Sequence, residues 1–335
     1  NNENVYPHSL GLLYSAITHY LGWKHHCDEG IIMGLAPYGN SLDKVPGQKN
    51  KSYRSIFKKI LTKEKDFKYK VNLEYVNYYS ERNKWVTDKF IKIFGPKRKW
   101  SDPLSKHHKN IAAALQDQLE HVVLNQLKVA RKKFKLSKLC LSGGVALNCS
   151  LNGKIAKSKI FKEIFVQPAS GDDGCTYGAS LLAYAKSKKK FMPKKMHNFY
   201  KGSIFTNNQI KKEILKSNVK YECPKNLYKN VSNHLEKGKI VAWFQGGSEF
   251  GPRALGNRSI LCRPYPNEMK DHLNIRVKFR EEFRPYAPSV LNEYRDEFFH
   301  INQDSPHMLI ACKIKKDKRK IIPAIVHVDG TCRVQ

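Results

Sequence analysis

The sequence carries no signal for a membrane or for export. No apolar run in the 335 residues approaches the roughly 20 residues of a membrane span, and the first residues lack the pattern of a signal peptide. The eight cysteines form no CxxC pair and no other metal-ligand spacing, which argues against a zinc module or a disulfide scaffold. We therefore expect a cytoplasmic protein with reduced cysteines and without a membrane partner.

Acidic residues and arginines are few beside lysine. The chain has 29 Asp and Glu against 61 Lys and Arg, which gives a formal net charge of +32, and only 13 of those 61 are arginine. The lysines are scattered over a chain rich in Asn and Ile, and such scatter is typical of a solvated surface more than of a nucleic-acid-binding face. A nucleic-acid partner is therefore disfavoured. The pI of 9.8 keeps a nucleic-acid-binding or tRNA-modifying protein as the alternative hypothesis.

The first hundred residues predict helices and a variable region. Residues 9–23 have helical spacing, and residues 33–40 contain glycines and a proline that predict a loop. Residues 41–100 are rich in lysine and aromatics with weak periodicity, which predicts an insertion or a peripheral subdomain. A long amphipathic helix begins near Asn110, where apolar residues recur at helical spacing.

The middle of the chain repeats one unit, in which a short apolar strand meets a glycine turn and then a helix. The first unit covers residues 136–156 and the second covers residues 163–186, and this alternation predicts an α/β fold. The basic stretch 187–198 contains Pro193 and lacks periodicity, so we place a domain boundary there. A second α/β region is expected after it.

The two glycine turns differ in charge. Gly143 and Gly144 precede a helix whose free N–H groups could hold a phosphate, although tight turns also use paired glycines. The second turn contains Asp172 and Asp173, and carboxylates are useful beside a phosphate when a cation bridges the two. Together the turns indicate metal-assisted nucleotide chemistry, with a helix N-cap as the alternative role for one aspartate.

Arginine is concentrated in one short region, since six of the 13 lie between residues 253 and 284. A planar guanidinium binds a phosphate or a carboxylate through two parallel hydrogen bonds, which lysine cannot do. If the segment before Pro285 is helical, Arg276 and Arg280 share a face, as do Asn274 and Lys278. The alternative is that two or three of the six pair with acidic neighbours. The six are Arg253, Arg258, Arg263, Arg276, Arg280 and Arg284, and the acidic neighbours are Glu249, Glu281 and Glu282.

The end of the chain carries a polar cluster. His327, Asp329 and Arg333 lie around a DG turn, directly after an apolar, strand-like run. A chain rarely stops at such a place, so we expect further sequence beyond it.

Seven motifs, in this order, resemble the NodU/CmcH carbamoyltransferase family. Its members carbamoylate nodulation factors, cephamycin and tobramycin. The resemblance covers almost the whole chain apart from residues 41–100, and its most specific motif is EFGPRALGNRSIL. The seven motifs are PHSLGLLYSA, MGLAPYG, LSGGVALNCSLNGKI, PASGDDG, EFGPRALGNRSIL, VKFREEFRPYAPSVL and HVDGTCRVQ.

The resemblance implies an α/β fold with two partial domains. Residues 1–190 would be the C-terminal part of an actin-like ATPase-type domain, and residues 198–335 would belong to a YrdC-like α/β domain. The family's N-terminal HxxxH metal motif is absent, and the family continues beyond the last motif. We therefore expect both ends to be missing, which would leave the metal site incomplete and could leave this piece inactive.

The chemistry implied by the resemblance uses carbamoyl phosphate, ATP and a divalent metal, which could be Fe, Mn, Zn or Mg. The YrdC-like domain would release carbamate, and the ATPase-like domain would join it to AMP with loss of pyrophosphate. The carbamoyl group would then pass from carbamoyl-adenylate to a hydroxyl of a small-molecule acceptor. Family members are often homodimers, so a homodimer is also considered.

The family's functional residues are carried over by motif. The positions on the nucleotide loop are Gly143, Gly144, Val145, Asn148 and Gly171. The metal-ligand position is Asp172. The positions associated with carbamoyl phosphate, and hence with catalysis, are Arg253, Arg258, Lys278, Arg280 and Arg284.

Overall fold

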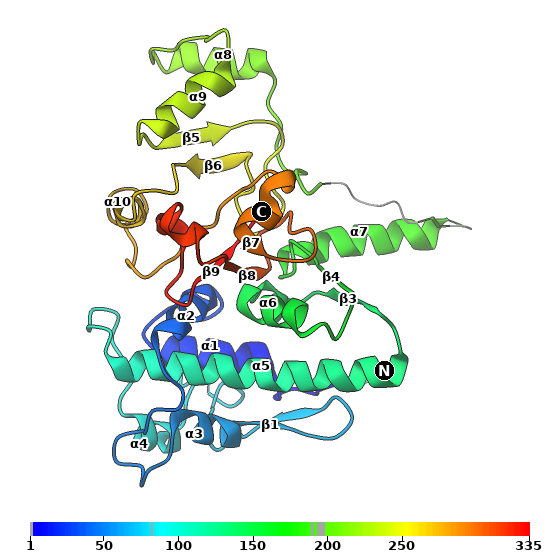
Figure 1. Ribbon diagram of the computed structural model, residues 1–335. Coiled ribbons are helices and arrows are strands. Elements are labelled where there is room, and N and C mark those ends of the chain that lie inside the picture. Colours follow the sequence, from blue (N-terminus) through cyan, green and yellow to red (C-terminus); the bar gives the residue numbers. More distant parts are fainter. Residues whose placement is uncertain (1–2, 82, 189–190, 193–197) are drawn as a thin grey trace.

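One long helix, α5 (Lys106–Phe134), organises the N-terminal half of the molecule (Figure 1). Ser105 begins it through a capping box with His108, and Ile111 and Leu115 lie on its buried face. The predicted amphipathic helix is therefore confirmed. The computed structural model describes residues 3–81, 83–188, 191–192 and 198–335.

The largest core joins α5 to the elements that precede it. Of the two alternatives predicted for residues 41–100, the peripheral subdomain is wrong, because Phe57 and Phe90 are fully buried in the same cluster as Ile17, while the insertion stays a prediction. Short elements and turns supply these core residues, so no single period is visible in the sequence. The elements are α1 (Leu10–Tyr20), α2 (Glu29–Leu35), α3 (Tyr53–Ile60), β1 (Leu61–Lys63), β2 (Tyr69–Val71) and α4 (Asp88–Phe94).

The predicted loop at 33–40 is largely helical, so this prediction is also wrong. The helix α2 continues to Leu35, and a 3-10 turn covers Ala36–Tyr38. Ile32 and Leu35 are fully buried, and this packing outweighs the poor helix propensity of the glycines.

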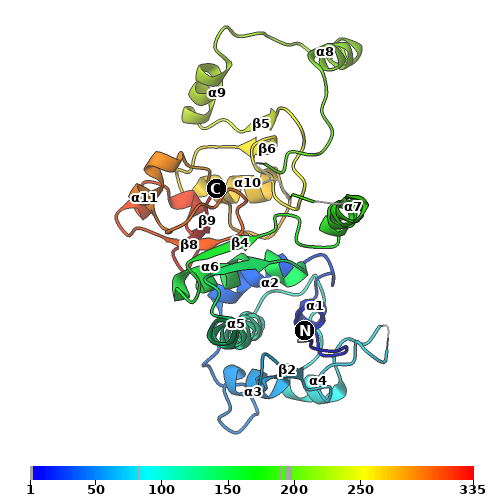
Figure 2. The same ribbon diagram turned by 90° about the vertical axis from the view of Figure 1, so that its right-hand side faces the viewer.

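Two parallel strands follow α5 in the chain, namely β3 (Lys138–Leu141) and β4 (Glu163–Val166). The helix α6 (Cys149–Ser158) connects them, and α7 (Asp173–Ser187) follows β4. Both predicted strand–turn–helix units are therefore confirmed, and the fold is mixed α/β. The helix α7 projects from the body in Figures 1 and 2, and it has no buried residue.

The region after residue 198 starts with two helices and an antiparallel strand pair at the top of Figure 1. Neither of these two helices has a buried residue. Within the described ranges, no helix is both long and apolar enough to cross a membrane. The elements are α8 (Asn207–Lys216), α9 (Leu227–Glu236), β5 (Val241–Phe244), β6 (Arg258–Leu261) and then α10 (Glu268–Arg276).

The last strands pack back on the first half of the chain. They are β7 (Phe299–His300), β8 (Ala311–Ile314) and β9 (Thr331–Arg333), which form an antiparallel sheet. One core cluster joins Ile314 of β8 to Leu151 of α6, so this core takes residues from both sides of the expected boundary. Part of that boundary, Pro193 included, lies outside the described residues. The division into domains 1–190 and 198–335 stays a prediction.

Candidate active site

Four arginines from three segments gather where the C-terminal strands meet the loops before and after β6 and α10. They are Arg253, Arg280, Arg284 and Arg333. Burial lowers the pKa of Arg253 to about 10, and repulsion from Arg333 and Arg284 adds to this effect. Burial also lowers the pKa of Arg280, with Arg284 and Arg333 again contributing. Like charges thus stand close together in a place with little water to screen them.

The cluster is incompletely paired inside the protein. In the described part of the chain, Nε of Arg253 and Nη1 of Arg333 are buried nitrogen atoms without a hydrogen-bond partner. Arg284 lies 3.4 Å from the carboxylate of Glu281, which balances one charge. An unsatisfied buried donor costs about 1–3 kcal/mol, more when it is charged, so the arrangement favours a bound anion.

The loop that carries Arg253 is shaped by a carboxylate and a glycine. Glu249 accepts hydrogen bonds from the backbone N–H groups of Leu255 and Asn257, at 2.7 and 2.8 Å. Burial would raise the pKa of Glu249, but these backbone hydrogen bonds lower it. Gly251 has φ +125, and a Cβ there would lie 2.7 Å from the carbonyl oxygen of Pro168. The EFGPRALGNRS loop therefore packs directly on the chain that follows β4, and Glu249 shapes the loop instead of pairing with an arginine side chain.

Asn274 holds the segment that carries Arg280 and Arg284. Its buried amide donates to the carbonyl oxygens of Glu282 and Arg284, and its Oδ1 accepts from Nε of Arg280 at 2.8 Å. The helix α10 ends at Arg276, and Phe279 then adopts φ +47, which turns the chain away from a helical path. The predicted helical pairing of Arg276 with Arg280, and of Asn274 with Lys278, is therefore wrong.

The same segment docks on the N-terminal half of the molecule. The Glu281 carboxylate accepts a hydrogen bond from the indole N–H of Trp23 at 2.6 Å, while it also faces Arg284. Phe283 contacts Trp23 and Tyr38 edge-on. The arginine cluster is thus fixed from both halves of the chain.

The other two predicted catalytic residues, Arg258 and Lys278, lie outside the buried arginine cluster. The Arg258 guanidinium donates to four backbone carbonyls and lies 3.5 Å above the ring of Phe244. The carbonyls belong to Ser203, Gln245, Gly246 and Asn257. Lys278 is exposed, and its ammonium has no partner among the residues described. The structure does not bring Arg258 into the buried cluster.

The glycine loop after β3 is open. Gly143 has φ +94, and its N–H donates to the carbonyl of Ser170 at 2.9 Å, which ties this loop to the turn after β4. A Cβ on Gly143 or Gly144 would meet nothing within 4 Å, so both glycines leave space for a ligand. The Val145 side chain packs against the core near Gly11, so only its backbone can serve a ligand.

Asn148 serves the structure with its side chain. It caps α6 by accepting from the N–H of Leu151 at 2.9 Å, and it exchanges two hydrogen bonds with Gln116. Gln116 in turn binds Tyr14 and the buried carboxylate of Glu120. No local pattern in the sequence predicts this network, because its members come from α1, α5 and the start of α6.

The acidic turn supplies few metal ligands. Asp172 is exposed at the N-cap position of α7 but makes no capping hydrogen bond, and Asp173 lies in the first turn. Gly171 lies between this pair and Ser170, beside the open loop. Among the described residues, no group of three or more His, Cys, Asp or Glu side chains could hold a metal ion. These residues therefore do not fit a metal site by themselves.

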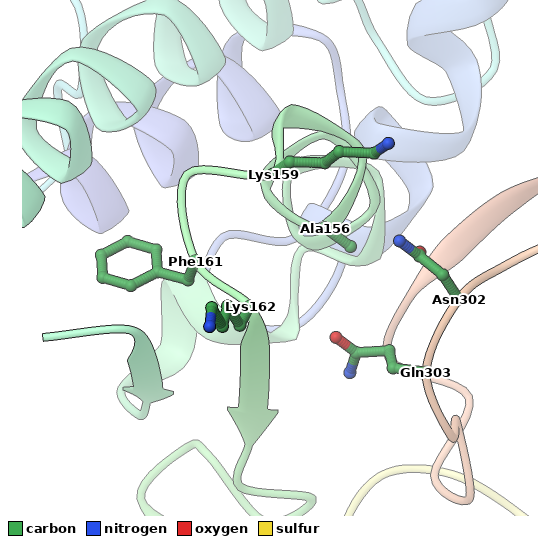
Figure 3. A pocket seen from close by; sticks show the side chains of 6 residues that line it. All are labelled: Ala156, Lys159, Phe161, Lys162, Asn302 and Gln303. Carbon is green, nitrogen blue, oxygen red and sulfur yellow. The ribbon is translucent and has the colours of Figure 1, made fainter.

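A surface pocket of about 240 Å³ lies elsewhere, between the end of α6, the start of β4 and the loop after β7 (Figure 3). Gln303 on its rim is already paired with both backbone groups of Ile164. None of the predicted site residues lines this pocket, so it belongs neither to the arginine cluster nor to the open glycine loop. Its lining residues are Ala156, Lys159, Phe161, Lys162, Asn302 and Gln303.

Comparison with known protein families assigns both regions. Residues 1–181 match the family model described as "Carbamoyltransferase N-terminus", and residues 232–335 match the one described as "Carbamoyltransferase C-terminus". The chain belongs to the carbamoyltransferase family. The resemblance drawn from the seven motifs is thereby confirmed. In this carbamoyltransferase-family chain, the open glycine loop lies in the N-terminal family region and all four clustered arginines lie in the C-terminal one.

Named relatives support the same assignment. The chain is 36% identical to nodulation protein NolO of Bradyrhizobium diazoefficiens, over 98% of the chain and 57% of that protein. It is 29% identical to 3'-hydroxymethylcephem-O-carbamoyltransferase of Streptomyces clavuligerus, over 92% of the chain and 52% of the relative. The chain therefore spans about half the length of these curated relatives.

Arg333 is the member of the cluster that sequence analysis did not place. Its motif was singled out as a polar cluster, but it lies 80 residues from Arg253 along the chain. The only signal was its position in a family motif. The charge of Arg333 lowers the pKa of Arg253 and of Arg280, because the fold brings β9 near these two arginines.

Proposed function

We propose that this protein is an ATP-dependent carbamoyltransferase that takes its carbamoyl group from carbamoyl phosphate. It would form carbamoyl-adenylate with release of pyrophosphate, and would then transfer the carbamoyl group to a hydroxyl of a small molecule. The S. clavuligerus relative is named as an O-carbamoyltransferase, which supports an oxygen acceptor. The proposed architecture is an actin-like ATPase-type part followed by a YrdC-like part.

The buried arginine cluster carries this proposal. A small dianion such as carbamoyl phosphate offers several phosphate oxygens, and guanidinium groups bind such oxygens through parallel hydrogen bonds. Arg253 and Arg333 have buried nitrogen atoms available for it. When the bond between the carbamoyl carbon and the phosphate oxygen breaks, negative charge collects on the leaving phosphate. Fixed positive charges in a poorly hydrated site would stabilise that charge most strongly.

The two sites are connected through the turn after β4. Gly251 of the arginine loop packs on Pro168, and Gly143 of the open loop donates to Ser170, two residues further along. ATP on the open glycine loop would thus lie next to the segment that supports the arginine loop. Such proximity would shorten the path of a labile carbamate between the two reactions.

Partners beyond the substrates remain proposals. Asp172 would contribute one carboxylate to a divalent metal, whose other ligands are not supplied by the described residues. A homodimer is proposed from the family alone, and its mass in solution would be measured by light scattering. The alternative of nucleic-acid binding predicts an RNA affinity that falls steeply with salt.

Pyrophosphate release tests the function without knowledge of the acceptor. Protein, ATP and a divalent metal are mixed with or without carbamoyl phosphate. Because the relatives are longer than this chain, the assay is run on the chain and on the longest protein that its gene encodes. We expect pyrophosphate only when carbamoyl phosphate is present.

Matched arginine variants assign that activity to the cluster. Arg333→Met should abolish pyrophosphate release, while Arg295→Met should leave it intact, because Arg295 pairs with Asp296 and Asp304 at the surface. Release without carbamoyl phosphate, or no release from either protein, would contradict the proposed function.

A further inference from the structure

His327 has the features of a catalytic base. Its side chain is only 7% exposed, and its Nδ1 lies 3.5 Å from Oδ1 of Asp329. Its Nε2 is a buried atom without a hydrogen-bond partner. One imidazole nitrogen therefore faces a carboxylate, and the other is free to accept a proton.

A tight turn fixes this pair. The N–H of His327 donates to the carbonyl of Thr331, and the N–H of Gly330 donates back to the carbonyl of His327. The Asp329 carboxylate also accepts from the N–H and the hydroxyl of Thr331, at 3.0 and 2.6 Å. Burial would raise the pKa of Asp329, but the hydrogen bonds from His327 and Thr331 hold it well below its usual range. An ionised Asp329 orients the ring with Nδ1–H toward itself and leaves Nε2 as the acceptor.

Two structural connections run from this pair toward the arginine cluster. Side chains alternate along a strand, so Thr331 and Arg333 share one face of β9, about 7 Å apart along it. Cys332 points the other way, into the core with Cys312. The second connection begins at Tyr38, whose ring the His327 ring contacts edge-on, with the ring centroids 5.4 Å apart.

Tyr38 extends this second connection. Its ring contacts Phe283, which directly precedes Arg284 of the cluster. The charged and titratable groups around this turn are Asp329, Tyr38 with Lys109 over its ring and Asp271 acting on it, Lys313, whose ammonium donates to the carbonyl of Asp329, and Arg319, whose guanidinium lies against Gly330. A buried histidine with a purely structural role normally uses both ring nitrogens, whereas this one leaves Nε2 unpaired.

We propose that His327 is the general base for cleavage of carbamoyl phosphate, an inference that rests on the function proposed above. Nε2 takes a proton from a water molecule as the water oxygen bonds to the carbamoyl carbon. The bond from that carbon to the phosphate oxygen breaks, and the second proton of the water passes from the carbamic acid to the phosphate, which leaves toward the arginines as hydrogen phosphate. Carbamate remains, and the imidazolium, paired with Asp329, returns its proton to solvent.

The test measures inorganic phosphate released from carbamoyl phosphate by the wild type and by His327→Asn, between pH 5.5 and 8.5. We expect kcat of the variant to fall by about 100-fold or more, with loss of the acidic limb of the pH profile. Its Kd for inorganic phosphate, measured by calorimetry, should stay within about two-fold of the wild type, because the arginines are untouched. His300→Asn, on the exposed part of β7 in the same sheet, should change neither quantity.

A second variant keeps the test decisive if His327→Asn does not fold. Asp329→Asn retains the imidazole but removes its carboxylate, so the acidic limb should move to lower pH and kcat should fall. Wild-type kcat and pH profile in His327→Asn, or an unmoved acidic limb in Asp329→Asn, would overturn the inference and leave the proposed function standing. A wild-type protein that releases no phosphate would overturn the proposed function itself and the role of His327 with it.

Discussion

The open glycine loop and the arginine cluster both contain glycines, and both are proposed to bind phosphate groups. They differ in how much each region destabilises the folded protein when no ligand is bound. The loop at Gly143 and Gly144 is exposed and stores no charge. The cluster holds four like charges, and Arg253 and Arg333 keep buried nitrogen atoms unpaired. Water can hydrogen-bond to the exposed backbone of the loop, whereas the buried arginines need an anion to balance their charge.

This difference has a consequence for stability. Buried charge that lacks a partner destabilises a protein. A substitution that removes an arginine of the cluster should therefore weaken phosphate binding and raise the stability of the ligand-free protein. A neutral, exposed loop has no such conflict, and changes there should affect binding and stability in the same direction.

Substitution of Arg253 by Met should have the largest effect. Loss of a charged hydrogen-bonding group should weaken binding of inorganic phosphate by about 10- to 150-fold. Relief of repulsion should raise the unfolding free energy of the ligand-free protein by about 1–3 kcal/mol. Calorimetry and denaturant unfolding measure the two quantities. A loss of both affinity and stability would show that the cluster is an ordinary structural feature.

Ligands should stabilise the protein separately at the two regions. Inorganic phosphate at 100 times its Kd should add about 2.7 kcal/mol to the unfolding free energy, and Arg333→Met should remove this gain. The stabilisation by ATP should survive in the same variant. Thermal unfolding with each ligand makes the comparison, and a parallel loss of both gains would mean that the two sites are one.

Gly143→Ala should show the opposite pattern to Arg253→Met. Its φ of +94 is unfavourable for alanine, so stability should fall by about 1 kcal/mol and ATP binding should weaken. Gly144→Ala is the matched control, because Gly144 has no positive φ and equal open space. Denaturant unfolding and nucleotide titration provide the readings. A stabilised Gly143→Ala variant would contradict the contrast between the regions.

The smallest effect is expected at His19. This side chain can lose its charge when it is buried, so it does not destabilise the folded protein as a buried arginine does. Burial lowers the pKa of His19 to about 4, and Lys97 and His25 add repulsion. The unfolded chain then binds more protons than the folded one between about pH 4 and 6.5, so stability falls as the pH is lowered through this window. Arginines cannot lose their charge in this way.

The measurement is the unfolding free energy of the wild type and of His19→Asn from pH 7 to 4.5. Because His19 is only half-buried, solvent screening reduces the effect, and we expect the variant to lose about 1 kcal/mol less than the wild type on acidification. Parallel curves for the two proteins would show that His19 is protonated equally in both states.

Local patterns in the sequence predicted much of the fold. The helical spacing around Leu115 and the two strand–turn–helix units were sufficient for α5 and for β3 to α7, because periodicity and glycine turns act over a few residues. The segment 41–100 could not be placed in this way, since Phe57 and Phe90 are buried by partners far along the chain. Local patterns also failed for the segment after α10, which was expected to be helical. Phe279 has a positive φ and Asn274 hydrogen-bonds to Arg280, so this segment forms a turn.

The sequence by itself determined which residue types the sites contain and in which motifs they occur, because glycine turns and the choice of arginine over lysine are local features. Only the tertiary structure decided how each is used. In the folded chain the Arg258 guanidinium donates hydrogen bonds to backbone carbonyls, and the Asn148 side chain hydrogen-bonds with Gln116. Arg333 comes near Arg253, although 80 residues separate them in the sequence. The physical reason is burial: a guanidinium at the surface is satisfied by water, while the same group in a crowded interior requires a specific partner.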